Sequence, residues 1–239
     1  MTARRIASIA TALLATVALA ACSAETVEAD DARPAVSESP SPPGAAGGPV
    51  TGLSLADAIA KLPVAAEVRD GYKRDSFKHW VDEDGDTCNT RMEVLKAEAV
   101  VAPEQGPRCT LTGGEWLSYY DEQTVTDPKG LDIDHMVPLA EAWDSGASQW
   151  DAERREAYAN DLGAERSLVA VTAKTNRSKA DRDPQDWMPP AESARCTYLV
   201  DWTATKLRWT LSADEAEVAA LQELAAGCPD STVKFELAP

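Results

Sequence analysis

The 239-residue chain is 44% hydrophobic and 26% charged, with ordinary amounts of glycine and proline. This composition excludes a wholly disordered, collagenous or coiled-coil protein and allows one or two domains with a buried core. The formal net charge of −17 excludes a generally basic surface that would bind nucleic acid or anionic lipid by charge alone. Any contact with nucleic acid must therefore depend on a specific site.

The first residues have the pattern of an export signal. Arg4 and Arg5 precede an uncharged apolar run, residues 6–21, which is shorter than a membrane-spanning helix needs. The run ends in Leu-Ala-Ala-Cys, which resembles the bacterial lipobox. This resemblance implies that residues 1–21 are removed and that Cys22 receives a lipid. The alternative is an ordinary signal peptide with an incidental cysteine.

The next segment, residues 22–50, is rich in Ser, Pro and Gly and has little periodic apolar character. Such a composition cannot bury enough surface to fold, so we expect a disordered tether. The folded domain is expected over residues 51–239. The protein would then lie on the outer face of the cell membrane, held by its lipid anchor only, or be secreted if the lipobox is not used.

Local patterns within the domain predict short helices and strands without internal repeats. The predicted helices are 54–63, 90–99, 148–160, 172–180, a long helix from 189 that contains Trp202 and Trp209, and 212–227. Their predicted first residues are capping residues, namely Ser54, Thr90, Ser148, Thr172 and Ser212. The predicted strands lie within 113–126, at 131–134 and at 168–171. The fold class is therefore α+β and mostly helical.

Four cysteines remain after Cys22, namely Cys88, Cys109, Cys196 and Cys228. An even number in an exported chain suggests two disulfides, and three pairings are available. We favour Cys88–Cys109 and Cys196–Cys228, which close the shortest loops. The alternative, a metal site of four thiolates, is disfavoured because the chain has no Cys-x2-Cys pair.

The strongest chemical signal is the run Leu-Asp-Ile-Asp-His at residues 131–135. The alternation places Asp132 and Asp134 on one face of a strand, and His135 follows at once. Two carboxylates on one face repel each other unless a cation lies between them. A divalent metal with oxygen ligands would supply that charge.

A second polar group follows the strand at 168–171. A helix that begins near Thr172 places Asn176 and Lys179 on one face, one turn apart. Asn176 offers an amide oxygen to a metal, and Lys179 and Arg177 offer cations to a phosphate. The segment is also the densest basic cluster in this acidic chain.

Together these two runs resemble the HNH endonucleases, and most closely the C-terminal domain of GmrSD-type restriction enzymes and small exported relatives. The resemblance implies a ββα-metal (HNH) core at about 131–187 within a mostly helical domain stapled by the two disulfides. It implies that His135 is the general base and that Asp134 and Asn176 hold one divalent metal, Mg²⁺ or alternatively Mn²⁺. Asp132 would orient the site or bind the metal through water.

One position departs from the family pattern. Related proteins often carry an asparagine on the second strand that holds the catalytic histidine, and Ser167 stands there in this chain. A hydroxyl can still make one hydrogen bond, so Ser167 is the expected partner of His135. Asn160 is the alternative, although it stands at the expected end of a helix.

A second acidic run has the spacing of part of a calcium loop. Asp82, Asp84, Asp86 and Glu93 stand at positions 1, 3, 5 and 12 of such a loop, but Thr87 occupies the position that needs glycine. Two alternatives stay open. The run is a solvated acidic turn, or it flanks the active site with Arg91 contacting a phosphate.

The sequence therefore predicts an exported, metal-dependent endonuclease that acts on nucleic acid, expected to be DNA. One alternative is a surface lipoprotein that keeps the fold as a binding module without the chemistry, and another is hydrolysis of a different phosphodiester. The sequence identifies no protein partner and no oligomeric state.

Overall fold

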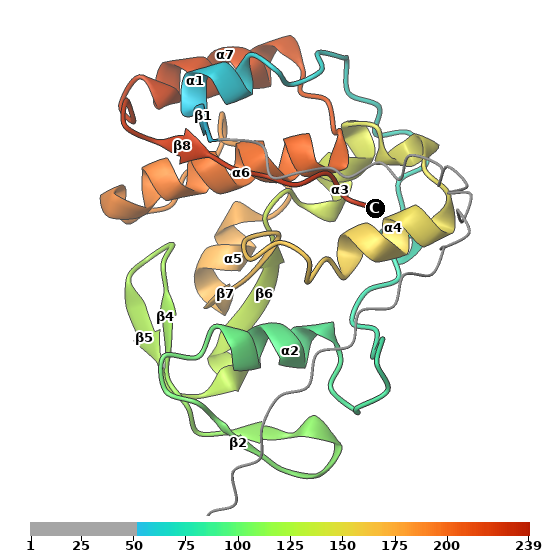
Figure 1. Ribbon diagram of the computed structural model, residues 1–239, viewed down its shortest axis with the longest axis vertical. Coiled ribbons are helices and arrows are strands. Elements are labelled where there is room, and N and C mark those ends of the chain that lie inside the picture. The colour runs from blue at the N-terminus through green and yellow to red at the C-terminus, as the bar shows by residue number, and fades with distance from the viewer. Residues whose placement is uncertain (1–51) are drawn as a thin grey trace, which may run out of the picture. The chain divides into compact units, whose positions relative to one another are not determined.

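The computed structural model describes residues 52–239, and every structural statement below refers to them. The expected signal peptide, Cys22 and the tether lie outside the described residues. Figure 1 shows α6 between a layer formed by α1 and α7 and a layer formed by β6, β7 and α5, with α2 beyond the strands. Within 52–239, no helix is long and apolar enough to cross a membrane.

The secondary structure is mixed, with short elements. The helices are α1 (Leu55–Ile59), α2 (Thr90–Ala97), α3 (Leu139–Asp144), α4 (Ala152–Ala159), α5 (Ala173–Lys179), α6 (Arg195–Trp209) and α7 (Glu215–Ala225). The strands are β1 (Leu53–Ser54), β2 (Glu104–Gln105), β3 (Leu111–Thr112), β4 (Trp116–Ser118), β5 (Gln123–Val125), β6 (Leu131–His135), β7 (Leu168–Thr172) and β8 (Thr232–Val233). A short 3-10 turn, η1 (Arg74–Ser76), precedes α2.

The strands form four antiparallel pairs, and the longest is β6 with β7. Its register runs from Leu131 opposite Thr172 to His135 opposite Leu168. Thr172 caps α5 by accepting a hydrogen bond from the backbone N–H of Thr175, so the chain turns directly from β7 into that helix. The chain therefore contains β6, β7 and α5 in the predicted order, with α3 and α4 between the two strands.

Several helix starts differ from those predicted. Ser54 and Thr172 cap their helices as expected. Elsewhere a neighbouring Asn or Asp side chain accepts the first hydrogen bond, namely Asn89 in place of Thr90, Asp151 in place of Ser148, and Asp214 in place of Ser212. These residues are at least as good as Ser and Thr as caps, so the prediction fails by one to three positions. The long helix α6 begins at Arg195, not directly after Pro190.

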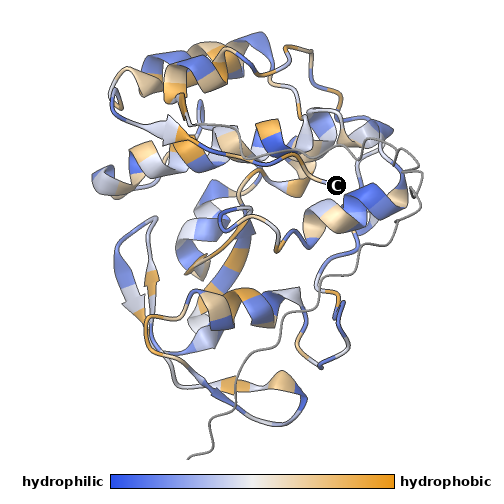
Figure 2. Ribbon diagram, viewed as in Figure 1, coloured by the Kyte–Doolittle hydropathy of each residue, from blue (hydrophilic) through white to orange (hydrophobic). Residues whose placement is uncertain are grey.

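Two hydrophobic clusters hold the domain together. The larger one surrounds α6 and includes Tyr198, Trp202 and Trp209. The smaller one joins α2 to one face of β6 and β7, formed by Leu131, Ile133, Leu168 and Ala170. The hydrophobic positions of these strands are orange in Figure 2. The favoured cysteine pairing is confirmed, since the structure contains the disulfides Cys88–Cys109 and Cys196–Cys228. The first lies in the smaller cluster, and the second joins the larger one, with Cys228 inside it and Cys196 packed against it.

A fully buried cation lies where α3, α6 and α7 meet. The ammonium group of Lys206 donates to Glu141 and Glu217 and to the hydroxyl of Ser145. Its side chain and that of Glu217 have no exposed surface. Burial raises the pKa of Glu217 to about 7, and the charge of Lys206 opposes that rise. The two carboxylates are therefore stable in the interior only while Lys206 balances them.

We expect Lys206→Met to destabilise the protein by about 3–5 kcal/mol at pH 8, because it leaves two buried carboxylates without their cation. The loss should shrink toward pH 5. Burial raises the pKa of Glu217 in the folded chain, and without Lys206 nothing opposes that rise, so the stability of the variant falls as the pH rises. Urea unfolding at both pH values measures this.

Lys78→Met is the matched control, since Lys78 forms an exposed ion pair with Glu156. That pair should contribute less than about 1 kcal/mol at either pH. Equal losses of unfolding free energy for the two variants would show that the buried ion pairs of Lys206 stabilise the protein no more than the exposed pair does.

Candidate active site

A cavity of about 320 Å³ opens where the end of β6 meets α5 and η1. It is lined by polar and charged residues from these three elements together with the residues that lead into α3. The lining consists of Arg74, Ile133, Asp134, His135, Pro138, Leu139, Asn176, Arg177, Ala180 and Asp181. The cavity therefore brings together Asp134, His135 and Asn176, although α5 follows β6 only after α3, α4 and β7.

His135 is the last residue of β6, and its imidazole is held by a backbone group. Nε2 lies 2.9 Å from the carbonyl oxygen of Ala159, the last residue of α4, so Nε2 carries the proton and donates it to that carbonyl. Nδ1 is then the nitrogen with a free lone pair. His135 lines the cavity while only 6% of its surface is exposed.

The imidazole is also held by aromatic packing. The ring of Trp80 lies 5.6 Å from that of His135 and is tilted by 30°, and the ring of Tyr158 lies 6.4 Å away, nearly parallel. Burial lowers the pKa of His135 to about 3, and the charge of Arg74 acts in the same direction, whereas the bond to Ala159 opposes it. His135 is therefore neutral at physiological pH in the metal-free protein.

Asp134 is anchored through one of its two carboxylate oxygens. Oδ2 accepts hydrogen bonds from the hydroxyl of Tyr120, at 2.6 Å, and from the ammonium group of Lys179. Within residues 52–239, no hydrogen-bond donor reaches Oδ1. Because Asp134 also lines the cavity, Oδ1 is the oxygen that remains for a ligand there.

Asn176 and Asp132 lie together beside Asp134. The amide nitrogen of Asn176 is 3.4 Å from Asp132 Oδ2, and the guanidinium of Arg177 is 3.3 Å from the same oxygen. With its nitrogen on Asp132, the amide of Asn176 keeps its oxygen as an acceptor. Asp132 is not part of the cavity lining and instead holds the two α5 side chains in place.

The prediction that Lys179 contacts a phosphate is wrong. Its side chain has no exposed surface, and its three N–H groups donate to Asp134 and to the backbone carbonyls of His135 and Met136. Asn176 and Lys179 do project from one face of α5, but Lys179 reaches the interior. Arg177 on the same helix stays at the surface, with 75% of its side chain exposed, and Lys174 is exposed as well.

Ser167 does not orient His135, contrary to the prediction. Its hydroxyl donates to Asp161, which also receives two hydrogen bonds from Arg208. The backbone carbonyl of Ala159 takes the place expected for a side chain, so the substitution at Ser167 leaves His135 with a partner. Arg91 is also committed elsewhere, since it donates to the carbonyls of Pro128 and Leu131.

Asn160 supports the histidine indirectly. Its amide nitrogen donates to the carbonyls of Lys78 and Glu156, and its amide oxygen accepts from the N–H of Val81 and the hydroxyl of Thr90. These bonds brace the turn that carries Trp80, whose φ of +62° is strained for a bulky residue. Asn160 therefore holds both the end of α4, which carries Ala159, and the turn of Trp80, which packs against His135.

Arg74 is a cavity residue that the sequence analysis missed. It lies in η1, is exposed, and forms no ion pair within residues 52–239. No motif marks it, because it reaches the cavity from a segment far from both polar runs. The only sequence signal is its position in the short basic stretch before Phe77.

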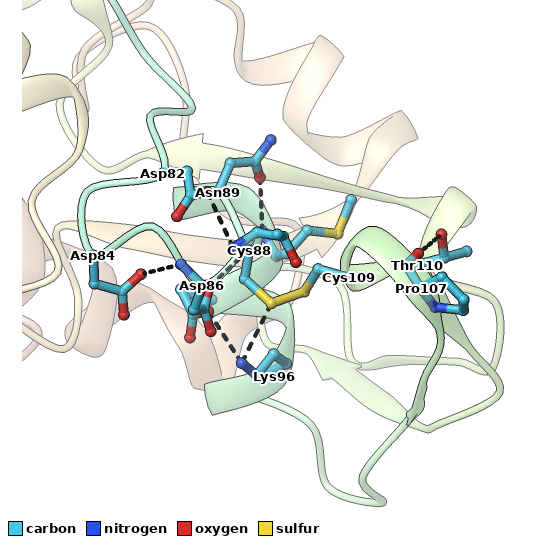
Figure 3. The surroundings of a disulfide bond; sticks show 12 residues. Asp82, Asp84, Asp86, Cys88, Asn89, Lys96, Pro107, Cys109 and Thr110 are labelled. Atoms are coloured by element: carbon cyan, nitrogen blue, oxygen red, sulfur yellow. Dashed lines mark hydrogen bonds and ion pairs between the residues drawn. A yellow bond between two sulfur atoms is a disulfide. The ribbon is translucent and has the colours of Figure 1, made fainter.

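The acidic loop lies apart from this cavity, beside the Cys88–Cys109 disulfide (Figure 3). Asp82, Asp84 and Asp86 approach one another, but their oxygens accept hydrogen bonds from backbone N–H groups of the same loop. Glu93 pairs with Lys96. Glu93 also lies close to Asp86, so the four predicted calcium ligands fall into two groups that share Asp86. The calcium site stays a sequence prediction.

Two comparisons with known proteins give matches. Residues 100–224, just over half of the chain, match the family described as GmrSD restriction endonucleases, C-terminal domain. A protein of Arthroderma benhamiae described as an uncharacterized secreted protein is 40% identical over 178 residues, which cover 74% of this chain and 85% of that protein. No solved structure matches the chain significantly.

We expect the imidazole of His135 to stay in the neutral, Nε2-protonated form from pH 8 down to at least pH 5 in metal-free protein, because it is buried and bonded to Ala159. Nitrogen-15 NMR of the labelled protein in EDTA distinguishes the two ring nitrogens and their protonation. A His135 signal that titrates with a midpoint near 6.5 would contradict this geometry.

Proposed function

Because the chain belongs to the family of the GmrSD restriction endonuclease C-terminal domain, we propose that it is a metal-dependent endonuclease. In this proposal β6, β7 and α5 form the ββα-metal unit of HNH nucleases. The observation that carries the proposal is one cavity that holds a neutral, anchored imidazole next to a carboxylate and an amide. Nucleic acid is the substrate, and DNA is the form we expect.

The donor set fits a hard divalent cation. Asp134, with its oxygen Oδ1 unbonded, and Asn176 line the same cavity, and oxygen ligands suit Mg²⁺ or Mn²⁺ better than softer metals. Two protein ligands leave coordination positions for water and phosphate oxygens, as Mg²⁺ commonly requires. When bound there, the ion would supply positive charge to a phosphodiester and its leaving oxygen.

His135 is the proposed general base. Its Nε2–H bond to Ala159 leaves Nδ1 to accept a proton from a water molecule that attacks the phosphorus. Packing against Trp80 and Tyr158 keeps the ring from rotating out of position, so the base is oriented before substrate arrives. The carbonyl of Ala159 also stabilises the protonated ring that forms during the step.

Arg74 and Arg177 are the proposed phosphate contacts. They reach the cavity from η1 and α5, and both are exposed. A guanidinium donates two parallel hydrogen bonds to phosphate oxygens. Because the chain has a net charge of −17, nucleic acid would be attracted to the cavity by this local pair of cations and not by the protein as a whole.

We also propose that the protein acts outside the cell. Two disulfides are expected in an oxidising compartment, and the Arthroderma benhamiae relative is described as secreted. The lipid anchor at Cys22 and the tether over residues 22–50 belong to this proposal, with the nuclease domain at 51–239. The alternative, a binding module without catalysis, is favoured only by the net charge of −17.

Plasmid cleavage by the oxidised protein tests the activity. We expect cleavage with Mg²⁺ or Mn²⁺, none in EDTA, and a loss of at least about 100-fold in rate for His135→Ala, since general-base catalysis contributes about that much. Ser167→Ala is the matched control and should keep most of the activity, because the Ser167 hydroxyl donates to Asp161 and not to His135. Folded protein that cleaves nothing under any metal would support the binding module.

Arg74→Ala should raise KM for DNA several-fold and reduce kcat, because the phosphate loses two hydrogen bonds close to the scissile bond. Lys73→Ala is the control, since Lys73 is an exposed neighbour outside the cavity lining. Steady-state kinetics at two salt concentrations separates this local effect from general charge. Equal kinetics for both variants would remove Arg74 from the proposed site.

A further inference from the structure

Asp134 has two neighbours that the proposed mechanism does not use. Tyr120 and Lys179 are both fully buried, and both donate to the same oxygen, Oδ2. The other oxygen, Oδ1, belongs to a side chain that lines the cavity. The carboxylate is thus held on its inner side, and its outer side is open to a ligand.

Lys179 fixes more than the carboxylate. Its remaining N–H groups donate to the carbonyls of His135, at 3.1 Å, and Met136, at 2.8 Å. One ammonium group therefore binds three consecutive residues at the end of β6. The rings of Tyr120, Tyr198 and Trp202 surround it at 5.6–5.8 Å, which offsets part of the cost of burying the charge.

The position of Lys179 on α5 links this clamp to the second proposed ligand. Asn176 stands one turn before Lys179 on the same helix, so the bonds from Lys179 to β6 also set the distance between the helix and Asp134. Groups that orient the ligands of a metal commonly affect its affinity by 10–100-fold.

We propose that Tyr120 and Lys179 are positioning residues that fix Asp134 through Oδ2 and leave Oδ1 as its single metal-binding oxygen. The metal-binding geometry is then formed before any ion arrives. This inference rests on the proposed function, because it assumes that the cavity binds a divalent metal.

The chain supplies a matched pair of variants. Tyr120→Phe removes the hydroxyl that donates to Asp134 and keeps the ring. Tyr198→Phe removes a hydroxyl of another fully buried tyrosine beside Lys179, and that hydroxyl has no hydrogen-bond partner within residues 52–239. Both changes leave the aromatic packing in place, so they differ in the contact with Asp134.

Mn²⁺ binding to the oxidised full chain, followed by electron paramagnetic resonance of free Mn²⁺, is the main measurement. We expect Tyr120→Phe to raise the Kd for Mn²⁺ about tenfold. Tyr198→Phe should leave the Kd within twofold of the wild-type value. Thermal unfolding in EDTA, measured in parallel, shows whether any change in affinity merely follows a change in stability.

Lys179→Met is the second variant, and we expect a weakening of Mn²⁺ binding of more than tenfold if the variant folds. If it does not fold, the two tyrosine variants decide. Equal Kd values for Tyr120→Phe and Tyr198→Phe, or tighter binding by Tyr120→Phe, would overturn the inference.

The outcomes separate this inference from the proposed function. Weaker Mn²⁺ binding by Tyr120→Phe, in a protein whose wild type cleaves no nucleic acid, would support the positioning role and reject the nuclease. Metal-dependent cleavage by the wild type with unchanged Mn²⁺ binding in Tyr120→Phe would support the nuclease and reject the positioning role. A wild type that binds no Mn²⁺ would overturn both.

Discussion

The buried ammonium group of Lys179 connects α5 to the end of β6, and the geometry of the candidate site depends on that connection. It binds the carboxylate of Asp134 and the next two backbone carbonyls, so the strand cannot shift along the helix without breaking three hydrogen bonds. A fully buried cation costs a large desolvation free energy, which a carboxylate, two carbonyls and three aromatic rings offset here. Such a group is hard to replace, because removing one partner leaves the other charged and unpaired.

A second set of contacts holds the imidazole itself. The carbonyl of Ala159 determines which ring nitrogen carries the proton, and Asn160 braces the turn that presents Trp80 to the ring. Polar groups that are this fully satisfied favour one arrangement over its alternatives. The histidine is therefore oriented by Ala159 at the end of α4 and by Trp80 in the turn before α2, and neither residue lines the cavity.

Much of the site could be predicted from the sequence because its signals are local. The alternation at residues 131–134 and the cap at Thr172 indicate a strand and a helix, and the resemblance to HNH nucleases joins Asp134, His135 and Asn176, which the cavity brings together. The disulfides follow from the shortest loops. The partner of His135 could not be predicted, since any residue supplies a backbone carbonyl. The burial of Lys179 and the approach of Arg74 depend on tertiary packing, which leaves no local pattern.

The central claim is that the cavity between β6 and α5 is a metal-dependent hydrolytic centre. The most direct test is a crystal structure of the Mn²⁺-soaked protein with anomalous scattering measured at the manganese edge. The account predicts an anomalous peak in the cavity, within coordination distance of Asp134 Oδ1 and of the amide oxygen of Asn176. An empty cavity in crystals that bind Mn²⁺ elsewhere, for example at the acidic loop of Asp82, Asp84 and Asp86, would contradict it.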